Sequence, residues 1–184
     1  SYAMMNPGGE VEMTEAVREA LDSLIQELCE ESEAKKEEVL EITIVGNPVM
    51  HHLFLGLDPI PLGQAPFVLG LKDAADFSAS ELDLSCHPAS RVHVLPCIAG
   101  HVGADTAAVV LATHLQDYEQ DEVIAVVDVG TNAEIVLSGK NRILAASSPT
   151  GPAFEGAQIS AGQRATPGAI ERVRIHPETG EPHI

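Results

Sequence analysis

The stretch that most constrains the fold is residues 123–137, VIAVVDVGTNAEIVL. Two apolar runs flank the hinge Gly130-Thr131-Asn132, and Asp128 lies near the end of the first run. Glycine and asparagine tolerate positive φ, so a hinge of these residues favours a tight turn between two antiparallel strands. The stretch therefore predicts a β-hairpin with a carboxylate beside its turn.

The turn of this hairpin offers groups that can hold a phosphate. Successive backbone N–H groups and the Thr131 hydroxyl can point at one anion, while Asp128 supplies a charge for a metal-bound water. The turn differs from a P-loop, because the Lys-bearing GxxxxGK[ST] pattern is absent from the sequence. An ordinary hairpin with a Gly-Thr-Asn turn uses the same residues, so the hairpin alone leaves both interpretations open.

Composition narrows the class of partner. The chain of 184 residues is long enough for one core or for pieces of two small lobes. A net charge of −18 and a pI near 4.6 argue against nucleic acid and against anionic membrane surfaces. Aromatic residues make up 3% of the chain, so stacking on bases is not expected either. No apolar run approaches the ~20 residues of a membrane span and no signal peptide is visible, so we expect a cytoplasmic protein.

The three cysteines do not form a metal-binding pattern. Cys29, Cys86 and Cys97 lie far apart and show no CxxC spacing. Reduced thiols in a cytoplasmic protein explain them. An iron–sulfur cluster needs four closely spaced ligands, so none is expected in this chain.

The histidines are interpreted as structural residues. His51 and His52 are neighbours on an expected helix, where adjacent side chains point about 100° apart, so one metal would not take both. We predict a packed or solvent-bonded pair. His101 lies in a loop and is interpreted as structural or solvated.

Both ends of the chain look like the ends of a piece. Ser-Tyr-Ala before Met4 resembles a cloning remnant, so residues 1–4 are set aside from the expected fold. At the other end, RIHPETGEPHI stops where a Pro-Glu-Thr-Gly turn should lead into a return strand. We therefore expect a piece of a longer protein.

Apolar periodicity predicts a mixture of helices and strands. An amphipathic helix with Thr14 as its expected cap carries apolar residues at helical spacing: Val17, Leu21, Leu24, Ile25 and Leu28. The acidic tract 30–38 is read as a solvated turn or short helix. LEITIV, residues 40–45, is uniformly apolar enough to predict a buried parallel strand. The remaining expected elements are a helix from Pro48, an irregular connection over 56–80, strands over 81–85 and 91–97, a helix over 104–115, and strands over 143–147 and 170–175.

Three loops follow apolar strands and are candidates for one shared cleft. They are Gly46-Asn47, residues 100–105 and residues 151–156. In α/β folds ligands collect at the carboxyl ends of strands, so these loops are expected to face a ligand. Asp105 stands at a helix start, where it either caps the helix or orients or deprotonates an attacking oxygen near a γ-phosphate. The segment 151–156 is either a Pro-initiated helix start or a phosphate-binding turn with Glu155 reaching the cleft.

Taken together, these loops resemble the superfamily of sugar kinases, acetate kinase, heat-shock chaperones and actin. IAGHVGADTAAVVLATHL followed by VDVGTNAEIVL is similar to the sugar-kinase order, in which a Gly-Asp helix start precedes the second phosphate hairpin. The resemblance implies an α/β, actin-like and sugar-kinase-like (ribonuclease H-like) two-lobe fold, present here in part. Asp105 would take the catalytic-carboxylate position, and Gly130 and Thr131 the phosphate position.

A closer resemblance covers nearly the whole chain from about residue 12. Six ordered blocks carry it: VGNPVMHHLFLGLDP, QAPFV, LPCIAGHVGAD, DVGTNAEIVL, GPAFEGAQIS and PGAIERVRI. They are similar to the actin-like core of the reductive activators of corrinoid proteins. The resemblance implies ATP-dependent reduction of an inactive Co(II) corrinoid to Co(I), which restores a methyl-transfer protein. In full-length members an N-terminal ferredoxin domain with a two-iron two-sulfur cluster delivers the electron.

The chain departs from that family pattern in several places. The ferredoxin domain, the first phosphate hairpin expected upstream and the Gly-rich adenosine-side segment expected beyond Ile184 are all missing. Pro48 stands where a threonine is expected, and His101 where an aromatic residue is expected. Residues 5–80 would then be part of the first lobe with the interlobe connection, and residues 81–184 part of the second lobe with the phosphate hairpin.

The resemblance also implies a set of site residues. Asp105 and Asp128 would be catalytic, with Asp128 at Mg²⁺. The nucleotide would contact Gly46, Asn47, Gly130, Thr131, Asn132, Glu134, Gly151, Glu155 and Gly156. ATP and Mg²⁺ are the cofactors expected in the full-length protein, and the two-iron two-sulfur cluster would not belong to this chain.

The implied partners are a corrinoid protein and a nucleotide, and a homodimer is left open. Two alternatives remain: a small-molecule kinase of the same superfamily with Asp105 as base, and a docking module that binds a corrinoid protein without catalysis. Whether this piece is itself an enzyme is also left open.

Overall fold

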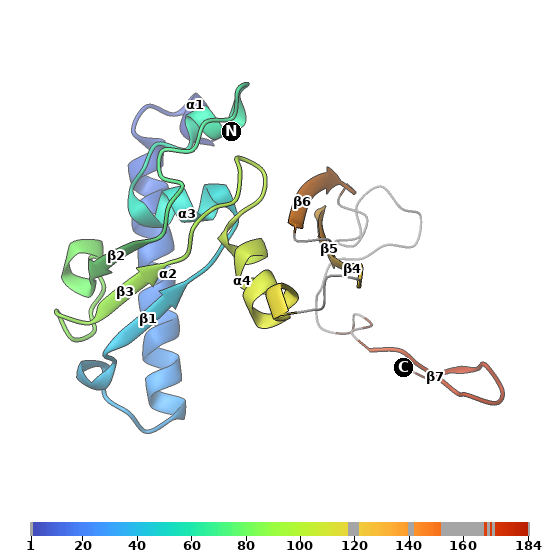
Figure 1. Ribbon diagram of the computed structural model, residues 1–184. Coiled ribbons are helices and arrows are strands. Elements are labelled where there is room, and N and C mark those ends of the chain that lie inside the picture. The colour runs from blue at the N-terminus through green and yellow to red at the C-terminus, as the bar shows by residue number, and fades with distance from the viewer. Residues whose placement is uncertain are drawn as a thin grey trace. The chain divides into compact units, whose positions relative to one another are not determined.

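The computed structural model describes residues 2–117, 122–139, 142–151, 168, 170 and 172–183 of the 184-residue chain. The fold is mixed α/β (Figure 1). It divides into two compact units, Ser1–Ala125 with Val136–Ala146, and Val126–Ile135 with Ser147–Ile184.

A three-stranded sheet organises the first unit. The strands are β1 (Glu41–Ile44), β2 (Ala75–Ser78) and β3 (Arg91–Val94), in the order β1-β3-β2. β1 runs parallel to β3, and β2 runs antiparallel to it. The parallel pairing of the segment around residues 40–45 confirms that part of its prediction. Its burial was predicted wrongly, because β1 is at the edge of this sheet and its residues are exposed or half-buried.

Two helices cover one face of the sheet. They are α2 (Gly9–Glu31), which runs behind the strands in Figure 1, and α3 (Pro48–Leu55). Val17 and Leu21 of α2 pack against a core cluster that draws on α3, β3 and the segment before β3. Its residues are Phe54, Ala79, Leu82, Leu84, Cys86, Val92 and Val94. The alternation along β3 explains the arrangement, since Val92 and Val94 face the helices while Arg91 and His93 face the other side.

The start of the chain is part of the packed unit. α1 (Tyr2–Met5) lies against α2, where the Tyr2 hydroxyl donates to Glu12 at 2.6 Å and Ala3 is buried. The cap expected at Thr14 is wrong, because α2 begins five residues earlier, after Gly8. Thr14 lies inside the helix and donates its hydroxyl hydrogen bond to the Glu10 carbonyl.

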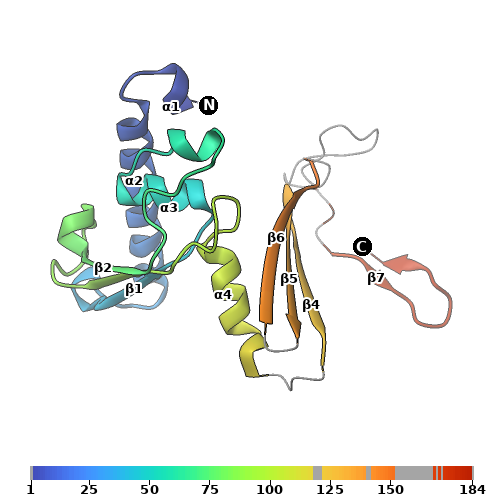
Figure 2. The ribbon, with the colours of Figure 1, turned by 45° about the horizontal axis from the view of Figure 1, so that its top comes forward.

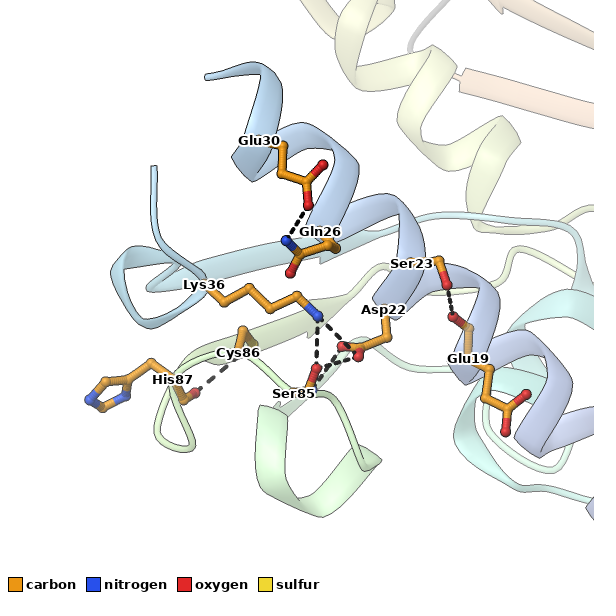
Figure 3. A network of polar contacts seen from close by, with 9 residues as sticks. All are labelled: Glu19, Asp22, Ser23, Gln26, Glu30, Lys36, Ser85, Cys86 and His87. Carbon is orange, nitrogen blue, oxygen red and sulfur yellow. Dashed lines mark hydrogen bonds and ion pairs between the residues drawn. The ribbon is translucent and has the colours of Figure 1, made fainter. Parts of the chain in front are cut away.

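A polar cluster of half-buried and exposed side chains ties α2 to the segments that flank the sheet (Figure 3). Asp22 accepts a 2.8 Å hydrogen bond from the Ser85 N–H and a second one from the Ser85 hydroxyl. Lys36, in the 3₁₀ turn η1 (Lys36–Glu38), lies 3.2 Å from Asp22 and 2.8 Å from the Ser85 hydroxyl. One carboxylate therefore joins a helix, a turn and a loop.

The region between α3 and β3 is more regular than expected. It holds two 3₁₀ turns, η2 (Ile60–Gly63) and η3 (Ala79–Leu82), and the strand β2 between them. The strand expected over residues 81–85 is wrong, since η3 occupies its start and Ser78 caps that turn with Glu81. The lobe boundary expected between residues 80 and 81 falls between β2 and β3 of one sheet.

After β3 the chain forms α4 (Ala104–Ala112) and the 3₁₀ turn η4 (Leu115–Asp117). A second three-stranded sheet follows, with β4 (Ile124–Val129), β5 (Asn132–Gly139) and β6 (Arg142–Pro149) in chain order (Figure 2). The predicted hairpin and third strand are confirmed. The last expected strand is shorter than predicted: β7 (Arg174–Ile175) pairs with β8 (Pro182–His183).

No helix within the described part of the chain is long and apolar enough to cross a membrane. The three cysteines are free thiols with buried side chains.

Candidate functional site

Two of the three candidate loops meet at one edge of the first sheet. The Ala104 N–H donates to the Gly46 carbonyl at 3.0 Å, and the Asp105 N–H lies 3.3 Å from the same oxygen. β1 and β3 are parallel neighbours, so the loops that leave their carboxyl ends start side by side. This confirms that the Gly46-Asn47 loop and the Asp105 loop belong to one place in the fold.

Gly103 makes this meeting of the two loops sterically possible. A Cβ atom at this position would lie 2.6 Å from the Gly46 carbonyl oxygen and 2.7 Å from the Asn47 Cα. Its φ of −87° is one that any residue adopts, so the requirement is for space and not for an unusual backbone conformation. The close approach of the two backbones therefore depends on a residue without a side chain.

Asp105 lies in the first turn of α4 and is half-buried. Gly103 is the N-cap residue, so the interpretation of Asp105 as the cap is wrong in detail. Its Oδ1 nevertheless accepts the Thr106 N–H at 2.8 Å, which satisfies one of the unpaired donors of the helix start. Within the described residues, hydrogen bonding uses only one of its two carboxylate oxygens.

Asn47 has a clear structural function. It is the N-cap of α3, and its side-chain oxygen accepts the Met50 N–H at 2.9 Å. Pro48 occupies the first helical position, as the sequence predicts. The side-chain amide nitrogen of Asn47 remains as the group that could meet a ligand.

A buried cysteine packs against the first residue of α4. Cys97 packs with Leu95 and Ala104 and is almost completely inaccessible to solvent. Burial raises the pKa of the Cys97 thiol above its ordinary value, although a hydrogen bond with the Ala104 backbone acts in the opposite direction. The thiol therefore stays protonated near neutral pH and acts as an apolar packing group.

The turn between β4 and β5 departs from the expected geometry. None of the three hinge residues has a positive φ, so that expectation is wrong. The Gly130 N–H donates to the Asn132 carbonyl at 2.8 Å, which leaves one donor fewer for an anion than predicted. Asp128, Thr131 and Asn132 are exposed, as a ligand-facing turn requires.

Thr150 fastens this turn to the end of β6, a contact that the sequence did not predict. Its hydroxyl lies 2.6 Å from the Gly130 carbonyl oxygen and 2.9 Å from the Thr131 carbonyl oxygen. The backbone N–H groups of Thr150 and Gly151 both donate to the Thr131 carbonyl, at 3.2 and 3.1 Å. Gly151 has a φ of +79°, which favours glycine. A Thr-Gly pair directly after an apolar strand was the available signal.

Glu134 lies further along β5, where its side chain accepts a hydrogen bond from Ser147 on β6 at 2.9 Å. Of the predicted set in the second unit, Asp128, Gly130, Thr131, Asn132 and Gly151 thus belong to one turn region, and Glu134 joins two strands. Glu155 and Gly156 lie outside the described residues.

The packed histidine pair is confirmed. His51 and His52 of α3 are buried, with exposed fractions of 2% and 0%. His52 accepts the Gly70 N–H at its Nε2 atom at 2.7 Å, so its Nδ1 atom carries the proton that is donated to the Pro48 carbonyl at 2.8 Å. The His101 ring packs at a tilt against the Phe67 ring, with ring centroids 4.5 Å apart. In the described residues, no three His, Cys, Asp or Glu side chains are placed to hold a metal ion.

Comparison with known families assigns nearly the whole chain, in two consecutive parts. Residues 1–118 match the family described as the RACo middle region, and residues 122–184 match the C-terminal domain of RACo, the ASKHA domain. ASKHA abbreviates the superfamily of acetate and sugar kinases, heat-shock chaperones and actin, and such a domain implies ATP binding.

Individual relatives agree with this assignment. The chain is 36% identical over 172 residues to the corrinoid activation enzyme RamQ of Eubacterium limosum, which covers 94% of this chain and 28% of that protein. It is 37% identical over 141 residues to the [Co(II) methylated amine-specific corrinoid protein] reductase of Methanosarcina barkeri, which covers 72% of this chain and 26% of that protein.

A solved structure has the same fold over most of this chain. The reductive activator for corrinoid,iron-sulfur protein matches with a TM-score of 0.81 and 36% identity, over 95% of this chain and 27% of that one.

Fold and comparisons together define a mixed α/β protein whose residues 122–184 match an ASKHA domain. The chain belongs to the RACo family, and it spans a little over a quarter of the length of the curated relatives that it matches.

Proposed function

We propose that this chain is part of an ATP-dependent reductive activator, which returns an inactive Co(II) corrinoid protein to Co(I) for methyl transfer. The observation that carries the proposal is the family match over nearly the whole chain, from residue 1 to 118 and from 122 to 184. The names of the relatives RamQ and the corrinoid protein reductase point to the same activity. No observation favours the kinase alternative in the same way.

In the proposed site, the turn after β4 holds the nucleotide phosphates. Asp128 is an exposed carboxylate at the end of a strand, which suits a hard cation such as Mg²⁺. Thr131 and Asn132 are the exposed turn residues nearest to it, and Thr150 keeps the turn in place through two carbonyl contacts. We therefore propose Thr131, Asn132 and Asp128 as the residues that contact the phosphate groups.

We propose separate roles for two loops of the first unit. Asp105 orients or deprotonates the attacking water, with Thr106 fixing one of its oxygens. Gly46 and Asn47 form the surface next to the Asp105 loop. The two loops can approach closely because Gly103 has no side chain. We further propose an actin-like arrangement of two lobes, in which nucleotide binding changes lobe closure and closure brings the corrinoid partner into a reducible state.

The described residues of this chain do not fit an iron–sulfur cluster. The three cysteines are buried on different elements and form no common ligand set. The electron would therefore enter from a two-iron two-sulfur domain in the remaining length of the full protein. We also propose a cytoplasmic location, since the corrinoid protein and the nucleotide would be met there.

A single substitution tests the proposed nucleotide role. In the full-length protein, Asp128→Asn should reduce ATP-dependent formation of Co(I), followed by the absorbance of the corrinoid, by at least about tenfold, since a carboxylate at the metal would be lost. Asp73→Asn, at an exposed position outside the site, is the matched control and should leave the rate unchanged. Equal rates for the two variants would remove Asp128 from the mechanism.

A further inference from the structure

One side chain at the end of β6 contacts two successive peptide groups of the turn between β4 and β5. β6 lies next to β5 in the second sheet (Figure 2), and Thr150 follows it directly. The Thr150 hydroxyl lies 2.6 Å from the Gly130 carbonyl oxygen and 2.9 Å from the Thr131 carbonyl oxygen. Its single proton can be shared between the two in a three-centre hydrogen bond. The hydroxyl therefore holds both carbonyl groups on the same side of the turn.

The backbone of the same segment reinforces this contact. The N–H groups of Thr150 and Gly151 donate to the Thr131 carbonyl oxygen at 3.2 and 3.1 Å. Gly151 has a φ of +79°, and a Cβ atom there would meet nothing within 4 Å, so glycine serves the backbone conformation and not a need for space. The Thr131 carbonyl oxygen thus has three donors around it, all from one short segment.

These contacts determine the direction in which the N–H groups of the turn point. The peptide bonds of the turn are trans, and in a trans peptide group the C=O and N–H bonds point in opposite directions. The Thr131 carbonyl belongs to the same peptide group as the Asn132 N–H. Because that carbonyl points toward Thr150, the Asn132 N–H points away from the end of β6.

The Asn132 N–H is thereby held in a fixed direction beside the carboxylate that we propose for Mg²⁺. Asn132 begins β5, Asp128 lies near the end of β4, and both residues are exposed. The Gly130 N–H is directed elsewhere, since it donates to the Asn132 carbonyl at 2.8 Å. Backbone N–H groups in turns are common donors to anions, so the oriented Asn132 N–H suits a phosphate oxygen.

The Thr150 contact is better suited to orienting the turn than to stabilising the fold. Thr150 and Thr131 are exposed, and Gly130 is half-buried. Hydrogen bonds near the surface add little net stability, because water competes for both partners. The loss of the hydroxyl should therefore change the direction of the turn's donors more than it changes folding.

We propose that Thr150 is a positioning residue for the nucleotide, which directs the Asn132 N–H toward a phosphate oxygen through its contacts with the Gly130 and Thr131 carbonyls. This inference rests on the proposed function, in which the same turn holds the phosphates. It adds a residue from outside the turn that does not itself touch the nucleotide. What the position requires is a hydroxyl group, so serine should replace threonine and valine should not.

Calorimetric titration of the full-length protein with ATP and Mg²⁺ tests the inference. Thr150→Val keeps the shape of the side chain and removes the hydroxyl, and it should weaken ATP binding about tenfold because a charge-assisted hydrogen bond is misdirected. Thr150→Ser keeps the hydroxyl and should bind ATP within about twofold of the unsubstituted protein.

A second threonine of the chain provides the matched control. The Thr113 hydroxyl donates to the Val109 carbonyl at 2.6 Å, at the opposite end of α4 from Asp105. Thr113→Val removes the same kind of hydrogen bond away from the turn and should leave the affinity for ATP unchanged.

The dependence of Co(I) formation on ATP concentration separates positioning from a general loss of structure. Thr150→Val should raise the ATP concentration that gives half the maximal rate, by about the same factor of ten, and should reach the rate of the unsubstituted protein at saturating ATP. Its melting temperature without nucleotide should equal that of Thr113→Val. A lower melting temperature together with a lower maximal rate would assign Thr150 a structural role and overturn the inference.

The other outcomes distinguish this inference from the proposed function. If Asp128→Asn weakened ATP binding and Thr150→Val did not, the inference about Thr150 would be wrong and the proposed function would stand. If neither substitution changed the affinity, the turn would not hold the phosphates, and the inference would fall with that part of the proposed function. Equal losses in Thr150→Val and Thr150→Ser would mean that the hydroxyl is not the group that matters.

Discussion

Two adjacent histidines on α3 are both buried, yet their ring nitrogens differ in hydrogen bonding. His52 bonds at both nitrogens, to Gly70 and to Pro48, whereas His51 has no partner at either nitrogen within the described residues. Replacing an unpaired buried polar group by an apolar one removes its desolvation cost, whereas removing one partner of a satisfied pair creates such a cost.

The two positions should therefore respond differently to the same substitution. His52→Leu should lower the free energy of unfolding by about 1–3 kcal/mol, because the Gly70 N–H and the Pro48 carbonyl lose their partner. His51→Leu should leave it unchanged or raise it. Urea denaturation of both variants at pH 7.5 measures the difference, and equal losses would contradict the assignment of hydrogen bonds.

The same pair predicts how stability depends on pH. Burial lowers the pKa of His51 and of His52 below the ordinary value of 6.5. The folded state therefore prefers neutral rings, and the stability that this contributes is complete above pH 6.5 and is lost as the pH falls below it. The slope should reach up to about 1.4 kcal/mol per pH unit for each ring. Denaturation between pH 5 and 8 should show this decline, and His51→Leu should make it shallower.

At the scale of elements, position 103 requires glycine because there is no space for a side chain, and not because the backbone conformation is unusual. A side chain there would meet the Gly46 and Asn47 backbones at 2.6 and 2.7 Å, whereas a Cβ at Gly130 would meet its nearest atom only at 3.4 Å. Gly103→Ala should therefore lower the free energy of unfolding by about 1–3 kcal/mol, and Gly130→Ala should change it by less than about 0.5 kcal/mol. Urea denaturation of the 184-residue chain checks both values. An unchanged free energy of unfolding in the Gly103→Ala variant would mean that the two loops approach less closely than described.

The Asp22 cluster predicts a second effect between elements. Burial alone would raise the pKa of Asp22, but the hydrogen bonds from Ser85 and the ion pair with Lys36 outweigh it and lower the pKa below its ordinary value of 3.8. The stability from this carboxylate is present above pH 3.8 and is lost as the pH falls through the lowered pKa.

Asp22→Asn should therefore destabilise the chain by about 1–3 kcal/mol at pH 7 and by less at pH 3. Glu19→Gln, one turn earlier on the exposed side of α2, is the matched control and should have little effect at either pH. The same loss at both pH values would show that the charge of Asp22 is not what matters.

The elements that the sequence predicted well are those with local signals. Asn47 before a proline marked the start of α3, and the alternation of apolar runs marked the hairpin. The failures depend on contacts between distant residues. The strand expected over residues 81–85 became a 3₁₀ turn, because Ser78 and Glu81 cap each other and end β2 there. Thr150 was missed for the same reason, since its contact with the hairpin turn depends on where β6 ends relative to β4.

The candidate site could be anticipated to a similar extent. The meeting of the loops after β1 and β3 follows from the rule that carboxyl ends of parallel strands share an edge, so Gly46 and Asp105 could be grouped from the sequence. The hydrogen bond from the Gly130 N–H to the Asn132 carbonyl could not be predicted from the sequence, because it depends on the dihedral angles of the turn.

At the scale of the whole molecule, the energy of nucleotide binding limits what this chain can do alone. Micromolar affinity requires about 8 kcal/mol of binding free energy. A turn that supplies two or three charge-assisted hydrogen bonds gives roughly 1.5–3 kcal/mol for each before ordering costs, and one expected donor, the Gly130 N–H, is already used within the turn. The chain spans little more than a quarter of its relatives, so most of a nucleotide's contacts in the full protein would come from other segments.

We therefore expect calorimetric titration of the 184-residue chain with ATP and Mg²⁺ to show weak binding or none, and no hydrolysis. The full-length protein should bind ATP, and Asp128→Asn should weaken that binding while Asp73→Asn does not. Low-micromolar affinity of the short chain would contradict this expectation, because the groups of this turn and its neighbours would then suffice. If the short chain bound ATP with such an affinity and Asp128→Asn left that affinity unchanged, the nucleotide would have to bind away from the turn after β4.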